Sequence, residues 1–118
     1  MNQKERMLAN LPYRSWLDGL NEERLECKKK IYEYNNMPPD KQEEREKLLR
    51  EILGSTQPGY LCIESPFHCD YGYNISVGKD FFANYNFIVL DVGKVTIGDE
   101  FMCDPNVQIC TAGHPLLP

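Results

Sequence analysis

The chain has 118 residues and a formal net charge of −5, with a mean hydropathy of −0.53. This length suits one ordinary domain or one small domain with an appendage. The acidic balance argues against nucleic acid as the main partner, because neutralising phosphates requires a surplus of lysine and arginine. No apolar run approaches the roughly 20 residues of a membrane-spanning helix. No apolar segment follows the first residues either, so we expect no membrane contact, no secretory leader and a cytoplasmic protein.

The first part of the chain is predicted to be helical. A short helix over residues 1–10 should end before Pro12. Asn21 is expected to cap a second helix that runs to about Asn35. Four apolar side chains at helical spacing would give this second helix one buried stripe. They are Leu20, Cys27, Ile31 and Tyr34.

A third helix is predicted after the proline pair Pro38–Pro39. Asp40 and Glu43 have the spacing of a capping box at its start, and Gly54 should end it. Residues 54–59 are rich in glycine and polar residues, which is typical of a linker. The apolar stripe of this helix would consist of Leu48, Leu49, Ile52 and Leu53.

The charge composition of the chain changes near residue 60. Residues 1–59 carry 11 basic and 11 acidic side chains, whereas residues 60–118 carry 2 basic and 7 acidic ones. We therefore expect two domains: a helical one over residues 1–59, with a solvated outer face of mixed charge, and a more apolar one over residues 60–118.

The second domain carries a six-residue period. Aliphatic or small residues recur at steps of six in two series that start 20 residues apart, so we expect a two-residue insertion between Val89 and Ile97. Three short strands joined by sharp turns make one triangular coil of about 18 residues, and successive coils stack through parallel hydrogen bonds. The two series are Val77, Ala83 and Val89, then Ile97, Cys103 and Ile109.

This period predicts a mainly β fold, namely a parallel β-helix of about three coils over residues 60–118. The alternative is a set of antiparallel strands, but these would alternate with period two, which residues 81–82 and 88–90 do not. The residue after each aliphatic position should lie at a corner, where small or turn-forming residues fit best. Four such positions are Gly78, Asn84, Gly98 and Asp104.

Several runs of the sequence resemble maltose and galactoside O-acetyltransferases. They are residues 66–75, 81–86, 90–92, 95–99, 105–107 and 111–115, together with 24–25 and 32–35 in the helical part. The resemblance covers essentially the whole chain. It implies a left-handed parallel β-helix of hexapeptide repeats, an N-terminal helical cap domain over residues 1–59, and a homotrimer with active sites between subunits.

The resemblance also implies transfer of an acetyl group from the co-substrate acetyl-CoA to a hydroxyl of a mono- or oligosaccharide, without a metal. The acceptor would be of the maltose, glucose or galactoside type. A sugar hydroxyl needs a general base, and imidazole titrates near the working pH. The chain offers His68 and His114. His114 holds the family's catalytic position, while His68 is expected to be a surface or intersubunit side chain.

Five further side chains are candidates for binding the acceptor. Three of them, Asp70, Asn84 and Asp91, occupy positions that line the acceptor pocket in the family. Phe82 is expected to provide a packing surface, and Arg24 on the cap helix is expected to reach the acceptor. Carboxylates and amides bind adjacent hydroxyls in pairs, which orients a sugar. Aspartate and asparagine also favour β-helix corners, so a structural role stays open for each of them, and glutamates are alternative partners for the arginine. The five are Arg24, Asp70, Phe82, Asn84 and Asp91.

Family members are expected to continue for several coils beyond His114, and these coils supply most of the acetyl-CoA channel. We therefore expect a fragment, a truncated product or a shortened relative. The alternative function is a catalytically inactive remnant or an assembly partner.

A third interpretation, a zinc-dependent carbonic anhydrase of the β-helix type, is set aside. Such a site needs three histidine ligands, and the chain has two histidines.

The five cysteines are odd in number, and none of them forms a C-x-x-C pair or a cluster with zinc-finger spacing. In a chain without an export signal, buried thiols are the simplest interpretation. A structural disulfide or a metal site is the alternative. The cysteines are Cys27, Cys62, Cys69, Cys103 and Cys110.

Overall fold

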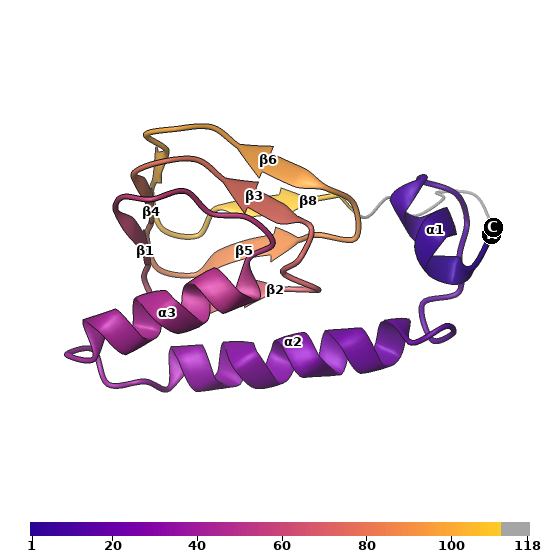
Figure 1. The fold of residues 1–118 in the computed structure, drawn as a ribbon, viewed down its shortest axis with the longest axis horizontal. Helices are drawn as coiled ribbons and strands as arrows, with labels where there is room; N and C mark the ends of the chain where they lie inside the picture. Colours follow the sequence, from indigo (N-terminus) through magenta and orange to yellow (C-terminus); the bar gives the residue numbers. More distant parts are fainter. Residues whose placement is uncertain (112–118) are drawn as a thin grey trace.

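Short parallel strands wind into a β-helix in the computed structural model, which describes residues 1–111 (Figure 1). Its three faces are the sheets β1–β4–β7, β2–β5–β8 and β3–β6, which make two full coils and two sides of a third. The predicted parallel β-helix is thereby confirmed. The strands are β1 Leu61–Ile63, β2 Phe67–Cys69, β3 Ile75–Val77, β4 Phe81–Ala83, β5 Phe87–Leu90, β6 Val95–Ile97, β7 Met102–Cys103 and β8 Gln108–Cys110.

Each strand from β1 to β5 pairs with the strand 20 residues further along the chain. Leu61 pairs with Phe81, Phe67 with Phe87, and Ile75 with Val95, and the same step continues into β7 and β8. The insertion predicted between Val89 and Ile97 is present. The first coil carries the same insertion between β2 and β3, since both ends of that corner keep the 20-residue register. The long corner is therefore a repeated feature of this helix.

The four predicted corner positions each follow a strand directly, and the left-handed residue of each turn lies two residues further on. Backbone φ is positive at Asp80, Asn86, Glu100 and Asn106, at 58°, 62°, 59° and 65°, and not at the four positions that the six-residue series indicated. Aspartate and asparagine adopt this left-handed conformation because their short side chains bond locally. The Asn86 amide also donates to the Asn106 side chain at 2.9 Å, which ties one coil to the next.

Aromatic side chains fill the interior of the coil. Alternate residues of each strand point inward, and Phe67, Phe81 and Phe87 are at most 1% exposed. Because the register repeats, rings 20 residues apart stack on each other. The Phe67 and Phe87 centroids lie 6.0 Å apart with an interplanar angle of 18°, and Phe81 and Phe101 lie 5.1 Å apart at 14°. Burial of such rings is the main favourable contribution to folding of this part.

Three helices precede the coil: α1 Gln3–Leu8, α2 Leu20–Asn35 and α3 Gln42–Ile52. The helices α2 and α3 run along the first coil, and α1 lies beyond it at the start of α2 (Figure 1). The two predicted apolar stripes are confirmed, since all eight side chains are buried. None of the helices within residues 1–111 is long and apolar enough to cross a bilayer.

Both predicted side-chain caps are wrong. Helix α2 begins after Gly19, whose φ of 81° is left-handed, and Asn21 lies inside the first turn. Helix α3 begins after Lys41 without a side-chain cap bond. Tertiary packing fixes the start of α2 instead, because its first residue, Leu20, is completely buried.

The helical segment covers strand edges of the first coil. The Asn35 side-chain amide accepts from the Phe67 N–H and donates to the Phe67 carbonyl, both at 2.9 Å. Ser55 forms a parallel bridge with Ser76 in β3, so the segment after α3 pairs with the coil. Exposed edges of this kind otherwise invite pairing with another chain. The division of the chain into domains at residue 60 stays a prediction.

Gly72 lies in the long corner between β2 and β3, against the end of α3. Its φ is 82°, and an added Cβ would collide with the carbonyl oxygen of Ile52. We expect Gly72→Ala to lower the free energy of unfolding by about 2 kcal/mol or more, since both the conformation and the contact exclude a side chain. Gly98→Ala is the matched control, because nothing lies within 4 Å of a Cβ there. Urea unfolding measures both variants, and equal losses would contradict this packing.

Candidate functional site

Two of the predicted site residues meet at the long corner between β2 and β3. Arg24, on α2, donates from Nη1 to the Tyr71 hydroxyl at 2.7 Å and from Nη2 to the Ser15 carbonyl at 2.8 Å. A longer bond of 3.3 Å reaches the Asn21 side chain. Asp70 begins the same corner, directly after β2. Arg24 thus connects α2, the loop before it and the corner that carries Asp70.

The Asp70 carboxyl group is half-buried and electrostatically coupled to its surroundings. Burial raises its pKa above the ordinary value of 3.8, while the positive charges of Arg24 and Lys28 oppose that rise. Burial also raises the pKa of Tyr13, with Arg24 opposing and Asp70 adding to the rise. Tyr13, Arg24, Asp70 and Tyr71 therefore form one group, here named the corner cluster.

The sequence alone did not indicate Tyr13 as a site residue. It lies in the loop between α1 and α2, and no spacing or motif marks it. A second, small hydrophobic cluster brings it into place, because α1 and the loop pack against the long corners of the coil. Buried Met7, Leu20 and Tyr71 form the centre of this cluster, with Tyr13, Tyr73 and Val92 packed around them.

Asp91 directly follows β5, one coil after the corner cluster. Its carboxylate accepts hydrogen bonds from the backbone of the β2–β3 corner. The side chain is completely buried. Its Oδ1 accepts from the N–H groups of Asp70 and Tyr71 at 3.0 and 2.9 Å, and Oδ2 accepts from the Asn74 N–H at 3.3 Å. Burial raises the pKa of Asp91, and these backbone donors oppose that rise. The carboxylate thus fixes the backbone that presents Asp70.

The other predicted acceptor residues lie on a different part of the coil. Phe82 points outward from β4 and lines a surface hollow of about 570 Å³ with Tyr60 and Met102. Asn84 directly follows β4, and its Oδ1 accepts from the Tyr85 N–H at 2.8 Å. The structure therefore brings Arg24 and Asp70 together, whereas Phe82 and Asn84 belong to another face and corner of the same chain.

The structure describes one of the two histidines, His68. His68 is exposed on the outward side of β2, in register with Ile88 of the next coil. His114 lies outside the described residues, so its place in the site stays a prediction. His68 is not part of the corner cluster.

Residues 1–111 offer few side chains that could bind a metal ion or the phosphates of coenzyme A. Within residues 1–111, no group of three or more histidine, cysteine or acidic side chains is arranged to hold a metal. The described coils carry two cations, Lys79 and Lys94, both exposed. Coenzyme A phosphates favour clustered cations and helix N-termini, so these two separate lysines do not by themselves form a coenzyme A site within residues 1–111.

The parallel coils, their hexapeptide series and the polar corner define a class, the hexapeptide-repeat β-helix proteins. Residues 6–57 match the family described as the maltose acetyltransferase hexapeptide capping motif. A putative acetyltransferase of Saccharomyces cerevisiae, YJL218W, is 47% identical over 93 residues, which cover 79% of this chain and 47% of that protein.

Two solved structures have the same fold. A maltose O-acetyltransferase from Clostridium difficile 630 superposes with a TM-score of 0.93 at 47% identity, over 98% of this chain and 62% of that one. A galactoside acetyltransferase in complex with coenzyme A superposes with a TM-score of 0.94 at 36% identity, over 99% and 58%. The chain belongs to the hexapeptide-repeat acetyltransferase family that contains these proteins. It spans about half to three-fifths of their length.

The raised pKa of Asp70 predicts a pH dependence of stability. A carboxyl group that holds its proton more tightly in the folded chain stabilises the fold below its ordinary pKa of 3.8, and this contribution is lost as the pH rises through the folded value. The quantity to compare is the difference in unfolding free energy, the unmodified chain minus the Asp70→Asn variant. We expect this difference to decrease as the pH rises above the ordinary pKa of 3.8.

Urea unfolding of both proteins from about pH 3 to about pH 6 measures this difference. Asp104→Asn, at an exposed position, controls for the loss of one negative charge. A difference that increases with pH would contradict a raised Asp70 pKa.

Proposed function

We propose that the protein transfers an acetyl group from acetyl-CoA to a hydroxyl of a mono- or oligosaccharide of the maltose, glucose or galactoside type. The observation that carries this proposal is the corner cluster, in which a guanidinium, a carboxyl and two phenols converge at a corner fixed by Asp91. The named activities of the relatives, and the coenzyme A bound to one of them, support the same reaction.

The corner cluster has the chemistry of a sugar site. A carboxylate accepts hydrogen bonds from adjacent hydroxyls, and a guanidinium donates to ring or hydroxyl oxygens. The Tyr13 ring, which is only partly buried, offers apolar surface for the face of a sugar ring, whereas Tyr71 is buried beneath it and holds Arg24. Arg24 is already held by Tyr71 and Ser15, so little conformational freedom is lost when an acceptor binds. We assign Arg24, Asp70 and Tyr13 to the acceptor.

His114 is the proposed general base. It would take the proton from the acceptor hydroxyl as oxygen attacks the acyl carbon, because a free hydroxyl is a weak nucleophile near neutral pH. Acetyl-CoA supplies the activated acyl group. The corner cluster would hold the sugar so that one hydroxyl faces the imidazole, which is the positioning contribution to the rate.

A homotrimer would reconcile the separate positions of the predicted residues. Arg24 and Asp70 lie at the β2–β3 corner, whereas Phe82 and Asn84 lie on and after β4. In a ring of identical subunits, one corner of each chain faces a different part of its neighbour. We propose that each acceptor site combines the corner cluster of one subunit with Phe82 and Asn84 of the next.

The direct assay incubates the chain with acetyl-CoA and a panel of maltose, glucose and galactosides. Mass spectrometry of the sugars should show a gain of about 42 Da, one acetyl group replacing a hydroxyl hydrogen. A thiol-detecting assay is unsuitable, because the chain itself carries 5 cysteines. A folded chain that yields no product would favour the assembly-partner alternative.

The two histidines provide a matched pair of variants. We expect His114→Ala to lower turnover by about 10²- to 10⁴-fold, the usual contribution of a general base, with the unfolding midpoint unchanged. His68→Ala replaces an exposed side chain on β2 and should leave turnover as it was. Equal turnover in both variants would remove His114 from the mechanism.

Mixing two inactive variants tests the shared site. Asp70→Ala and Asn84→Ala should each be inactive, but in trimers formed by mixing and refolding them, about a quarter of the interfaces would combine two intact halves. Activity should therefore return to about a quarter of the unmodified value. If both residues served the same subunit's site, mixing would restore nothing.

A further inference from the structure

Two buried thiols face each other where α2 packs on the β-helix. Cys27 lies on the inner side of α2, and Cys69 is the last residue of β2. Their Sγ atoms are 3.5 Å apart, and the Cys27 thiol is 3.8 Å from the Cys69 carbonyl oxygen. The side chains are 5% and 7% exposed. The two thiols are free in the structure, so they are positioned to react with each other.

The surroundings hold the two thiols at this distance. On one side of the pair, Arg24 bonds to Tyr71 at 2.7 Å. On the other side, the Asn35 amide bonds to the Phe67 backbone. Helix α2 is thus fixed to the coil at both ends of the contact. Sulfur atoms in a disulfide lie about 2.05 Å apart, so rotation of two short side chains must close the remaining gap.

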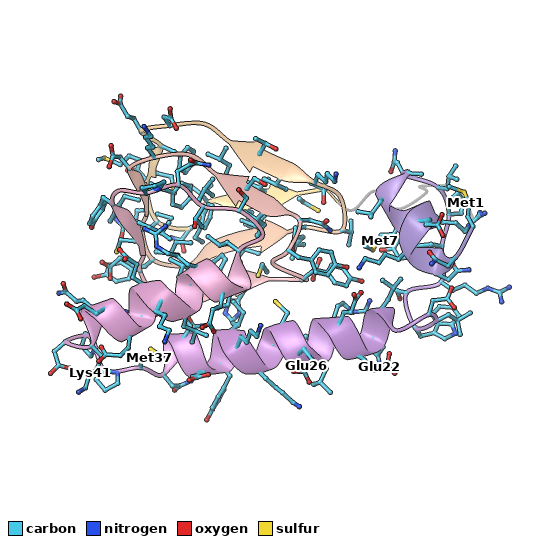
Figure 2. The ribbon with its side chains drawn as sticks, viewed as in Figure 1. Met1, Met7, Glu22, Glu26, Met37 and Lys41 are labelled. Atoms are coloured by element: carbon cyan, nitrogen blue, oxygen red, sulfur yellow. The ribbon has the colours of Figure 1, made fainter. Side chains whose placement is uncertain are left out.

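Cys27 can be reached from solvent through a cavity. It lines a space of about 310 Å³ between α2, the end of α3 and the long corner. Figure 2 shows Glu22 and Glu26 along α2, and both line this cavity. Its other lining residues are Glu23, Lys30, Glu51, Ile52, Tyr71 and Tyr73. Four carboxylates against one ammonium disfavour anionic oxidants, whereas a small neutral peroxide can enter.

We propose that Cys27 and Cys69 form a disulfide when the protein meets a peroxide. The Cys27 sulfur attacks one oxygen of hydrogen peroxide, which leaves a sulfenic acid on Cys27 and releases one water. The Cys69 sulfur then attacks the Cys27 sulfur, and the second water leaves with the Cys69 proton. The two thiols lose two hydrogens and two electrons in total, and the peroxide gains them.

The order of the two steps follows from access and ionisation. Cys27 lines the cavity, whereas Cys69 is not among the residues that line it. The hydrogen bond with Cys27, together with burial, holds the pKa of the Cys69 thiol well above its usual range. A thiol of this kind is a poor first nucleophile but serves as the resolving group once Cys27 is oxidised.

The disulfide would join α2 covalently to the corner cluster. Cys69 directly precedes Asp70, and Arg24 lies one helical turn before Cys27 on α2. Oxidation would therefore fix the helix and the corner relative to each other. The chemical step itself does not depend on the proposed acetyl transfer.

Peptide mapping of the peroxide-treated chain tests the proposal. Cleavage after glutamate places Cys27, Cys62 and Cys69 in three different peptides. We expect a cross-linked pair that contains Cys27 and Cys69, with a mass about 2 Da below that of the two separate peptides, and a higher thermal midpoint that falls again after reduction. Met102, which is 79% exposed, reports by its own oxidation that peroxide reached the protein.

Two variants separate this pair from other thiols. Cys27→Ala should abolish the cross-link, and Cys62→Ala, at the outward face of β1, should retain it. The proposal fails if Met102 is oxidised while Cys27 and Cys69 are both recovered as thiols. It also fails if either of them is found linked to another cysteine. Mapping of the unmodified chain decides the question even where a variant does not fold.

Discussion

The constant 20-residue register between parallel strands is the constraint on which the rest of this structure depends. It aligns Phe67 with Phe87 and Phe81 with Phe101, so that the interior consists of stacked rings. It places Asn86 beside Asn106 at one corner. A slip of one residue would turn every inward side chain outward, because alternate residues of a strand face opposite sides.

The same register builds the candidate site. Asp91 reaches back by one coil to accept the backbone N–H groups of Asp70 and Tyr71, so the corner has its shape only when the two coils are stacked. Helix α2 supplies the remaining part of the site, because its Arg24 donates a hydrogen bond to the Tyr71 hydroxyl from outside the coil. The polar chemistry of the site thus depends on two packing contacts of the chain, coil on coil and helix on coil.

Much of the fold was predictable because it follows from periodicity. The stripe from Leu20 to Tyr34 has helical spacing, and the series from Val77 has the spacing of β-helix sides. Helix starts were not predictable in this way. Asn21 and Asp40 have the right chemistry for caps, but burial of Leu20 moved the start of α2 to the preceding glycine.

The candidate site was predictable only in part, because contacts between distant segments leave little trace in one sequence. Arg24 and Asp70 came from the family resemblance, and the structure brings them together. Tyr13 has no motif, and its place depends on how α1 packs against Tyr71. The backbone contacts of Asp91 were not predictable from the sequence either. An aspartate at a corner gives the same sequence pattern whether its carboxylate faces solvent or accepts from three N–H groups.

The central claim is that a sugar acceptor binds at the β2–β3 corner. The most direct test is to titrate the isotope-labelled protein with maltose, glucose and a galactoside while following backbone amide resonances. The account predicts concentration-dependent shifts at the amides of Asp70 and Tyr71, with Thr96 on the outward side of β6 unchanged. Saturable shifts confined to other parts of the chain, with the corner amides unmoved, would contradict it.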